Sequence, residues 1–161
     1  ACPDMYSGAQ QVAFEEEQRQ PEGDVSGEGY GYGTTNQDLI ALIEPVRADL
    51  RVSCTWFLPP EFASTTTIAI IATATVADVE AVLSEASSES SALGGGMLWK
   101  LSDTVSNSGE MIANEAHFIT STECPESYAE TACSVWIAST NAAGSSEALT
   151  RDAAQVFGAL D

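Results

Sequence analysis

The chain has 161 residues and a formal net charge of −19, because 24 acidic residues stand against 5 basic ones. With so few and so scattered lysines and arginines, nucleic acid is not an expected partner, and anionic membrane surfaces are disfavoured. The hydrophobic fraction of 44% is close to the globular average, so we expect residues 1–161 to fold as a single domain.

The first regular segment that the sequence predicts is a short helix. Ser7 and Gln10 have the spacing of a capping box, and the glutamates at 15–17 oppose the helix dipole and end the helix. Residues 21–34 combine glycines, acidic side chains and tyrosines, a composition typical of a long surface loop. A second helix follows this loop and ends before Pro45.

The middle of the chain predicts a hairpin and a third helix. Hydrophobic and polar residues alternate over Arg51–Leu58, and Thr66–Thr73 is rich in β-branched residues, so the two segments are expected to pair as antiparallel strands. Thr75–Asp78 repeats the N-cap pattern at the start of a third helix. This helix is expected to decay into the serine-rich run Glu85–Ser91.

Three more strands and a last helix follow a break of three glycines. Hydrophobic and polar residues alternate over Met97–Leu101 and within the longer stretch Glu110–Thr120, and a final strand contains Val135. Ser145 or Ser146 caps a closing helix with an apolar stripe.

The predicted element order is therefore ααββαβββα. Strands that come in neighbouring runs joined by short turns favour antiparallel pairing. We expect an α+β fold with an antiparallel sheet of about five strands, with helices packed mainly on one face, and with two disulfides.

Four cysteines are widely spaced and form no C-x-x-C pair, which indicates two disulfides in an oxidising compartment. Cys124 and Cys133 flank the connection between the last two strands, within disulfide reach. Cys2 is then left to pair with Cys54. A lipid on Cys2 is the competing interpretation, but it would leave Cys54 as an odd thiol. We expect an extracytoplasmic protein, secreted or anchored to the cell surface, with an export segment upstream and no transmembrane segment.

Four short motifs carry a family resemblance: Cys2–Phe14, Ser53–Trp56, Asn114–Phe118 and Val135–Ser139. Together they resemble the exported domains of actinobacterial cell-envelope lipoproteins of unknown function. The resemblance implies that the first cysteine and the Cys-x-Trp cysteine are partners, that the protein lies in the cell envelope, and that a lipid tether lies upstream of residue 1. It implies no activity.

Glu115 and His117 form the one pair that suggests catalysis, as the acid and base of a small hydrolase. Residues two apart in a strand share a face without converging on a nucleophile, and no G-x-S-x-G motif accompanies them. We therefore expect a sheet histidine and no catalytic residue. A single histidine beside oxidised cysteines leaves too few ligands for zinc, so neither metal nor cofactor is expected.

The acidic loop offers a second candidate site. Glu22, Asp24 and Glu28 suggest calcium, although the spacing of a calcium-binding loop is absent and a solvated acidic face is the simpler interpretation. Tyr30 and Tyr32 suggest a recognition surface for a cationic or carbohydrate envelope partner.

The three tryptophans, Trp56, Trp99 and Trp136, are expected to pack the core or its rim. The function that the sequence favours is a non-enzymatic extracytoplasmic binding or accessory domain. Two alternatives stay open: a divalent-cation-dependent adhesion or sensing domain that uses the acidic loop, and a small hydrolase that uses Glu115 and His117.

Overall fold

The computed structural model describes residues 5–16, 20–24, 32–58, 62–86, 88–101, 114–141 and 145–160. Its helices and strands follow one another along the chain as α1 (Gly8–Glu16), β1 (Gln20–Asp24), α2 (Gln37–Ile43), the 3₁₀ turn η2 (Ala48–Leu50), β2 (Arg51–Leu58), β3 (Phe62–Ala72), α3 (Thr73–Glu85), β4 (Ser88–Leu93), β5 (Gly96–Leu101), β6 (Asn114–Thr122), β7 (Cys133–Asn141) and α4 (Ser146–Phe157).

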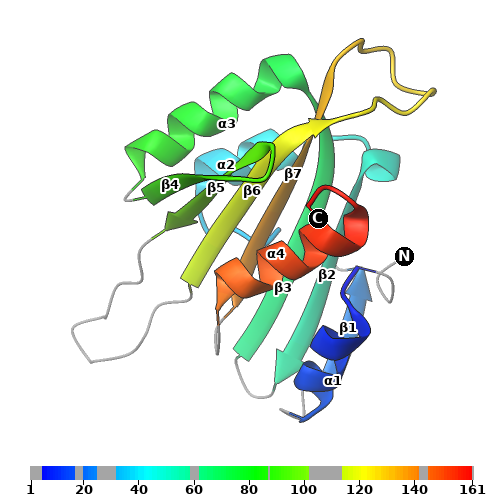
Figure 1. Ribbon diagram of the computed structural model, residues 1–161, viewed down its shortest axis with the longest axis vertical. Helices are drawn as coiled ribbons and strands as arrows, with labels where there is room; N and C mark the ends of the chain where they lie inside the picture. The colour runs from blue at the N-terminus through cyan, green and yellow to red at the C-terminus, as the bar shows by residue number, and fades with distance from the viewer. Residues whose placement is uncertain are drawn as a thin grey trace.

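The described residues form one antiparallel sheet of seven strands in the order β1-β2-β3-β7-β6-β5-β4 (Figure 1). The α+β class, the antiparallel pairing and the β2–β3 hairpin are confirmed. The expected count of about five strands is wrong, because the two outermost strands, β1 and β4, were not predicted.

Both missed strands lack the alternation of apolar side chains that marks a half-buried strand. β1 covers the start of the segment predicted as a loop, residues 21–34, and begins one residue before it. It pairs with β2 through a register that shifts between Pro21 and Gly23. β4, with the sequence SESSAL, lies in the predicted serine-rich tail and pairs with β5 across a two-residue turn. Backbone pairing alone adds such edge strands, so the side-chain pattern does not reveal them.

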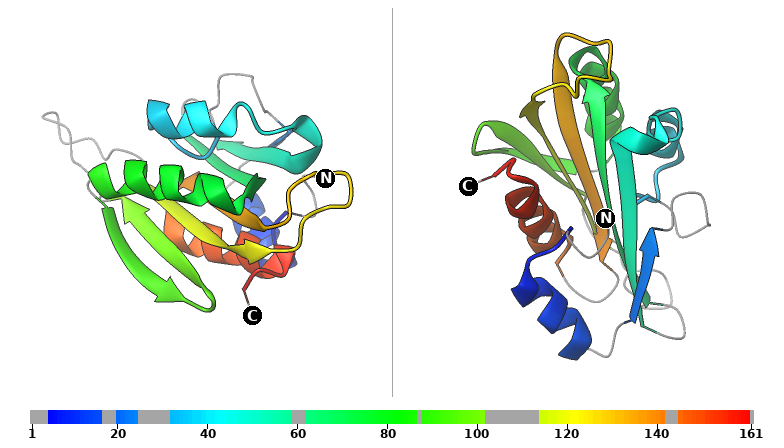
Figure 2. Two further views of the ribbon diagram at one scale, coloured as in Figure 1. Left: turned by 90° about the horizontal axis from the view of Figure 1, so that it is seen from above. Right: turned by 90° about the vertical axis from the view of Figure 1, so that its right-hand side faces the viewer.

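Helices cover both faces of the sheet, so the expectation that they pack mainly on one face is wrong. Helices α1 and α4 lie on one face, and α2 and α3 lie on the other (Figure 2). The reason is the central strand β3, in which Ile68 faces α4 while Ala69 and Ile71 face α2 and α3. A central strand that is apolar on both sides requires a cover on both sides.

Two hydrophobic cores result, one on each face of the sheet. The core under α1 and α4 contains Met5, Tyr6, Phe14, Cys54, Ile68, Leu98, Phe118, Val135, Ile137, Leu149, Ala153 and Ala154. The core under α2 and α3 contains Tyr32, Leu39, Ile43, Ala69, Ile71, Val79, Leu83, Ile119 and Trp136.

The predicted N-caps of α1 and α4 are confirmed. The Ser7 hydroxyl accepts from the Gln10 backbone N–H at 3.1 Å, and the Ser145 hydroxyl accepts from the Ala148 N–H at 3.0 Å. Ser7 also joins the two helices, because its hydroxyl donates to Asp152 of α4 at 2.5 Å.

One disulfide, Cys124–Cys133, closes the connection between β6 and β7 as predicted, with the two Cα atoms 5.1 Å apart. Cys54 is buried on β2 and is disulfide-bonded, and no described cysteine is free. Its predicted partner, Cys2, lies outside the described residues, so the Cys2–Cys54 pairing stays a prediction. Among the described helices, none is long and apolar enough to cross a membrane.

Gly33 lies where the chain approaches the sheet before α2. Its φ of +78° is a left-handed conformation, and a Cβ at this position would lie 2.2 Å from the Ala138 carbonyl oxygen of β7. Only glycine satisfies both the conformation and the close approach.

Gly33→Ala is expected to lower the free energy of unfolding by at least about 3 kcal/mol. The cost of a left-handed conformation in alanine adds to the cost of the clash between its Cβ and the Ala138 carbonyl oxygen. Gly158→Ala is the matched control. It has a φ of +92° and no atom within 4 Å of an added Cβ, so it should cost only about 1 kcal/mol. Urea unfolding measures both variants, and equal losses would contradict the close approach.

Candidate functional site

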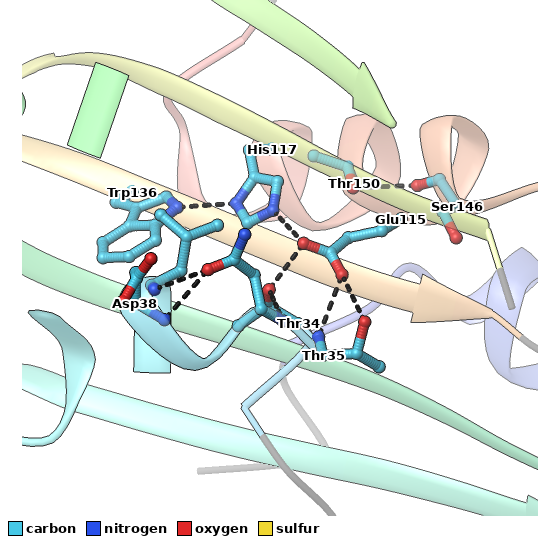
Figure 3. A network of polar contacts seen from close by, with 10 residues as sticks. Thr34, Thr35, Asp38, Glu115, His117, Trp136, Ser146 and Thr150 are labelled. Carbon is cyan, nitrogen blue, oxygen red and sulfur yellow. Dashed lines mark hydrogen bonds and ion pairs between the residues drawn. The ribbon is translucent and has the colours of Figure 1, made fainter. Parts of the chain in front are cut away.

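Glu115 and His117 lie next to each other on one face of β6, as the sequence predicted, and their side chains touch (Figure 3). The distance from His117 Nε2 to Glu115 Oε2 is 2.6 Å. Glu115 is 3% exposed and His117 is 0% exposed. The pair is therefore a contact inside the core under α2, away from the surface.

Trp136 of β7 fixes the tautomer of His117. The indole Nε1–H donates to His117 Nδ1 at 2.9 Å, so Nδ1 must act as the acceptor. The imidazole proton then lies on Nε2 and is donated to Glu115. The result is a directed chain of hydrogen bonds from Trp136 through His117 to Glu115.

The Glu115 carboxylate collects further donors from the segment that precedes α2. The Thr34 hydroxyl donates to Oε2 at 2.5 Å, and the Thr35 backbone N–H donates to Oε1 at 2.9 Å. Burial by itself raises the pKa of Glu115, but the hydrogen bonds from His117, Thr34 and Thr35 outweigh it and lower the pKa below its usual value of 4.5.

Thr34 connects this carboxylate to helix α2. Its hydroxyl also accepts from the Asn36 backbone N–H at 3.2 Å. The Asn36 side chain in turn caps α2, because Oδ1 accepts from the N–H groups of Asp38 at 2.9 Å and Leu39 at 3.1 Å. The polar network therefore runs from β7 and β6 to the first turn of the helix (Figure 3).

Four buried hydroxyl side chains on β2 and β3 continue the polar layer across the sheet. Ser53 bonds Thr67 at 2.5 Å, and Thr55 bonds Thr65 at 2.8 Å. In the strand register, Thr65 of β3 is opposite Thr140 of β7, which is opposite Glu115 of β6. Thr67 is likewise opposite Ala138, which is opposite His117. Pairing hydroxyls with one another satisfies groups that would otherwise be costly to bury.

The geometry gives the Glu115–His117 pair no free position for a substrate. Both ring nitrogens of His117 are engaged, one by Trp136 and one by Glu115. The proton of the neighbouring Thr34 hydroxyl is also engaged, because it is donated to the Glu115 carboxylate. In this arrangement the pair holds α2 against the sheet.

The residues of the acidic loop are only partly described. Tyr32 is 8% exposed and packs in the core under α2 and α3, with the Arg51 guanidinium 5.3 Å from its ring centre. Tyr30 and Glu28 lie outside the described residues. Glu22 and Asp24 lie on β1, where the side chains are not described.

The tryptophans pack the cores and their rims, as predicted. Trp136 is 1% exposed, and Trp56 stacks on Phe14 with ring centres 5.1 Å apart. Trp99 packs against the core under α2 and α3.

A cleft that the sequence did not reveal opens at the end of the sheet where β3 meets α3. Its volume is about 360 Å³, and its residues come from three separate stretches of the sequence: Leu42, Pro45, Val46, Arg47, Leu50, Ile70, Ile71, Ala72, Thr75, Asp78 and Tyr128. A second hollow of about 300 Å³ lies beside it and shares Leu50 and Ile70. Only the tertiary fold brings residues so far apart in the sequence together.

Arg47 holds one wall of this cleft. Its Nε and Nη2 atoms donate to the Asp49 carboxylate at 3.0 and 2.5 Å, and its Nη1 donates to the Ser127 carbonyl oxygen at 3.0 Å. The hydrogen bonds from Arg47 lower the pKa of Asp49. The turn η2 is thereby joined to the disulfide loop that carries Tyr128.

No family model, curated protein or solved structure matches the chain.

Glu115→Gln is expected to lower the free energy of unfolding at neutral pH by about 3 kcal/mol, because an amide NH₂ would face donors that now meet a carboxylate oxygen. The folded pKa of Glu115 lies below the unfolded one, so the carboxylate stabilises the fold above about pH 4.5, and this contribution is lost as the pH falls through the folded value. The unfolding free energy of the variant should depend less on pH in the acid range.

Chemical denaturation at a series of pH values measures this dependence. Glu126→Gln, at an exposed position in the disulfide loop, is the control and should reproduce the wild-type curve. A Glu115→Gln curve that runs parallel to the wild-type curve through the acid range would show that Glu115 is not the titrating group.

Proposed function

We propose that this chain is a non-enzymatic extracytoplasmic binding domain and that the cleft at the end of β3 is its ligand site. The observation that carries the proposal is the cleft itself, whose lining combines mainly apolar residues with a few polar ones. Its volume of about 360 Å³ falls at the lower end of the range of small-molecule sites, about 300–1,000 Å³.

The walls of the cleft are held before any ligand arrives. The disulfide Cys124–Cys133 closes the loop that carries Tyr128, and Arg47 ties that loop to η2. A site whose walls are already ordered loses less conformational entropy when it binds.

The lining residues favour a compact, mainly apolar ligand that is neutral or cationic. Leu42, Val46 and Ile71 line the cleft, while Thr75, Asp78 and Tyr128 supply its polar groups. The charge of Arg47 is matched by Asp49, whereas no described basic residue forms an ion pair with Asp78. The net charge of −19 adds a field that attracts cations.

The extracytoplasmic location is supported by the oxidised cysteines. Cys124 and Cys133 are paired, and Cys54 is disulfide-bonded, a state that persists in oxidising compartments. The resemblance to actinobacterial envelope lipoproteins is the basis for proposing a surface display with a lipid tether upstream of residue 1.

The two alternative functions have less support. A hydrolase would need Glu115 and His117 to reach a substrate, and both are buried with their polar atoms engaged. For a cation-dependent domain, the described residues contain no group of three metal-binding side chains. The side chains of Glu22, Asp24 and Glu28 are not among those described.

Titration of the isotope-labelled protein with three indole probes tests the site and its charge preference. Tryptamine is cationic, indole is neutral and indole-3-acetate is anionic, while their ring systems are the same. We expect amide shifts confined to the cleft, with tryptamine binding several-fold more tightly than indole-3-acetate. Asp78→Asn should remove most of that difference.

Val46→Trp fills the cleft and should abolish these shifts. Val12→Trp places the same substitution on α1, at a position that is 51% exposed and on the opposite face of the sheet, and it should bind as wild type does. Shifts that survive in Val46→Trp, or that map outside the cleft in the wild-type protein, would contradict the proposal.

A further inference from the structure

Strand β4 forms an outer edge of the sheet and pairs only with β5 among the described strands (Figure 1). Leu93 and Gly96 close the hairpin around a two-residue turn. In such a hairpin the closing pair is hydrogen-bonded and the pattern alternates. The backbone N–H and C=O groups of Ser88, Ser90 and Ala92 therefore point away from β5, to the free edge.

Four of the six residues of β4 are exposed to solvent. Glu89, Ser90, Ser91 and Ala92 are all exposed, although alternate residues of a strand point to opposite faces. β4 contains neither proline nor lysine, two residues that commonly block further pairing at an edge, and apart from Glu89 and Leu93 its side chains are small.

The surroundings of the edge are acidic. Helix α3 contacts β4, and its only charged residues are Asp78, Glu80 and Glu85. Lys100, opposite Glu89 in the register, has its Nζ 3.3 Å from Glu147 of α4. A second copy of the chain would bring another charge of −19 to this edge, which opposes self-pairing.

We propose that the β4 edge binds an extended, positively charged peptide segment, which adds to the sheet as a further antiparallel strand. Its backbone pairs with the outward N–H and C=O groups of Ser88, Ser90 and Ala92. Its basic side chains lie beside α3. This interface lies on β4, whereas the cleft is lined by residues of β3 and α3, with Asp78 of α3 counted at both. The cationic charge of the partner follows from charge complementarity.

An end-capped peptide of alternating lysine and valine, equal in length to β4, is the probe. We expect amide shifts centred on Ser88–Leu93, with slowed solvent exchange of the Ser90 and Ala92 N–H groups. The same peptide with glutamate in place of lysine should bind at least about tenfold more weakly. Equal binding of the two peptides, or shifts that map elsewhere, would overturn the proposal.

Ser90→Pro removes an outward N–H without breaking the β5 ladder and should weaken binding about fivefold or more. Ser90→Ala keeps the N–H and should bind as wild type does. Ala92→Pro removes the next outward N–H. It is used in place of Ser90→Pro if circular dichroism shows that Ser90→Pro is unfolded. Proline variants that bind normally would contradict strand addition. Dimerisation of the wild-type protein in sedimentation experiments, if Ser90→Pro abolishes it, would show that the edge pairs with a second copy and would contradict a cationic peptide as its partner.

Discussion

The buried carboxylate of Glu115 is the constraint on which the arrangement of α2 and the sheet depends. It receives hydrogen bonds from His117 on its own strand and from Thr34 and Thr35 before α2. A buried charge is tolerated only where donors surround it, so these hydrogen bonds hold the chain before α2 over β6 and β7. The close approach of Gly33 to Ala138 follows from the same path.

Side-chain patterns predicted the elements that bury apolar residues. β2 was predicted over its full range, and α4 with its N-cap, because alternation and helical spacing report burial directly. β1 and β4 were not predicted, because a strand at the edge of a sheet can pair through its backbone without alternating apolar side chains. The two-sided cover was missed because a run such as Ile68–Ala72 shows that β3 is apolar but does not show what covers each face.

The candidate site also has a part that the sequence predicted and a part that it did not. Glu115 and His117 were predictable as neighbours because they are two apart in a strand, but the third member, Trp136, comes from β7 and meets them only through sheet register. The cleft could not be predicted from the sequence, because its lining residues extend from Leu42 to Tyr128 and meet only in the folded chain. The domain combines a buried polar network, a cleft at one end of the sheet and an edge strand, β4, that pairs only with β5 among the described strands.

The polar interior is a fixed element of structure in which Trp136 sets the tautomer of His117. The chain contains a single histidine, so one imidazole signal reports on it in an ¹⁵N-correlated NMR spectrum without further assignment. We expect the neutral Nε2–H tautomer of His117, with an Nε2 proton that exchanges slowly with solvent. An Nδ1–H tautomer, or an Nε2 proton that exchanges freely in the folded protein, would contradict it.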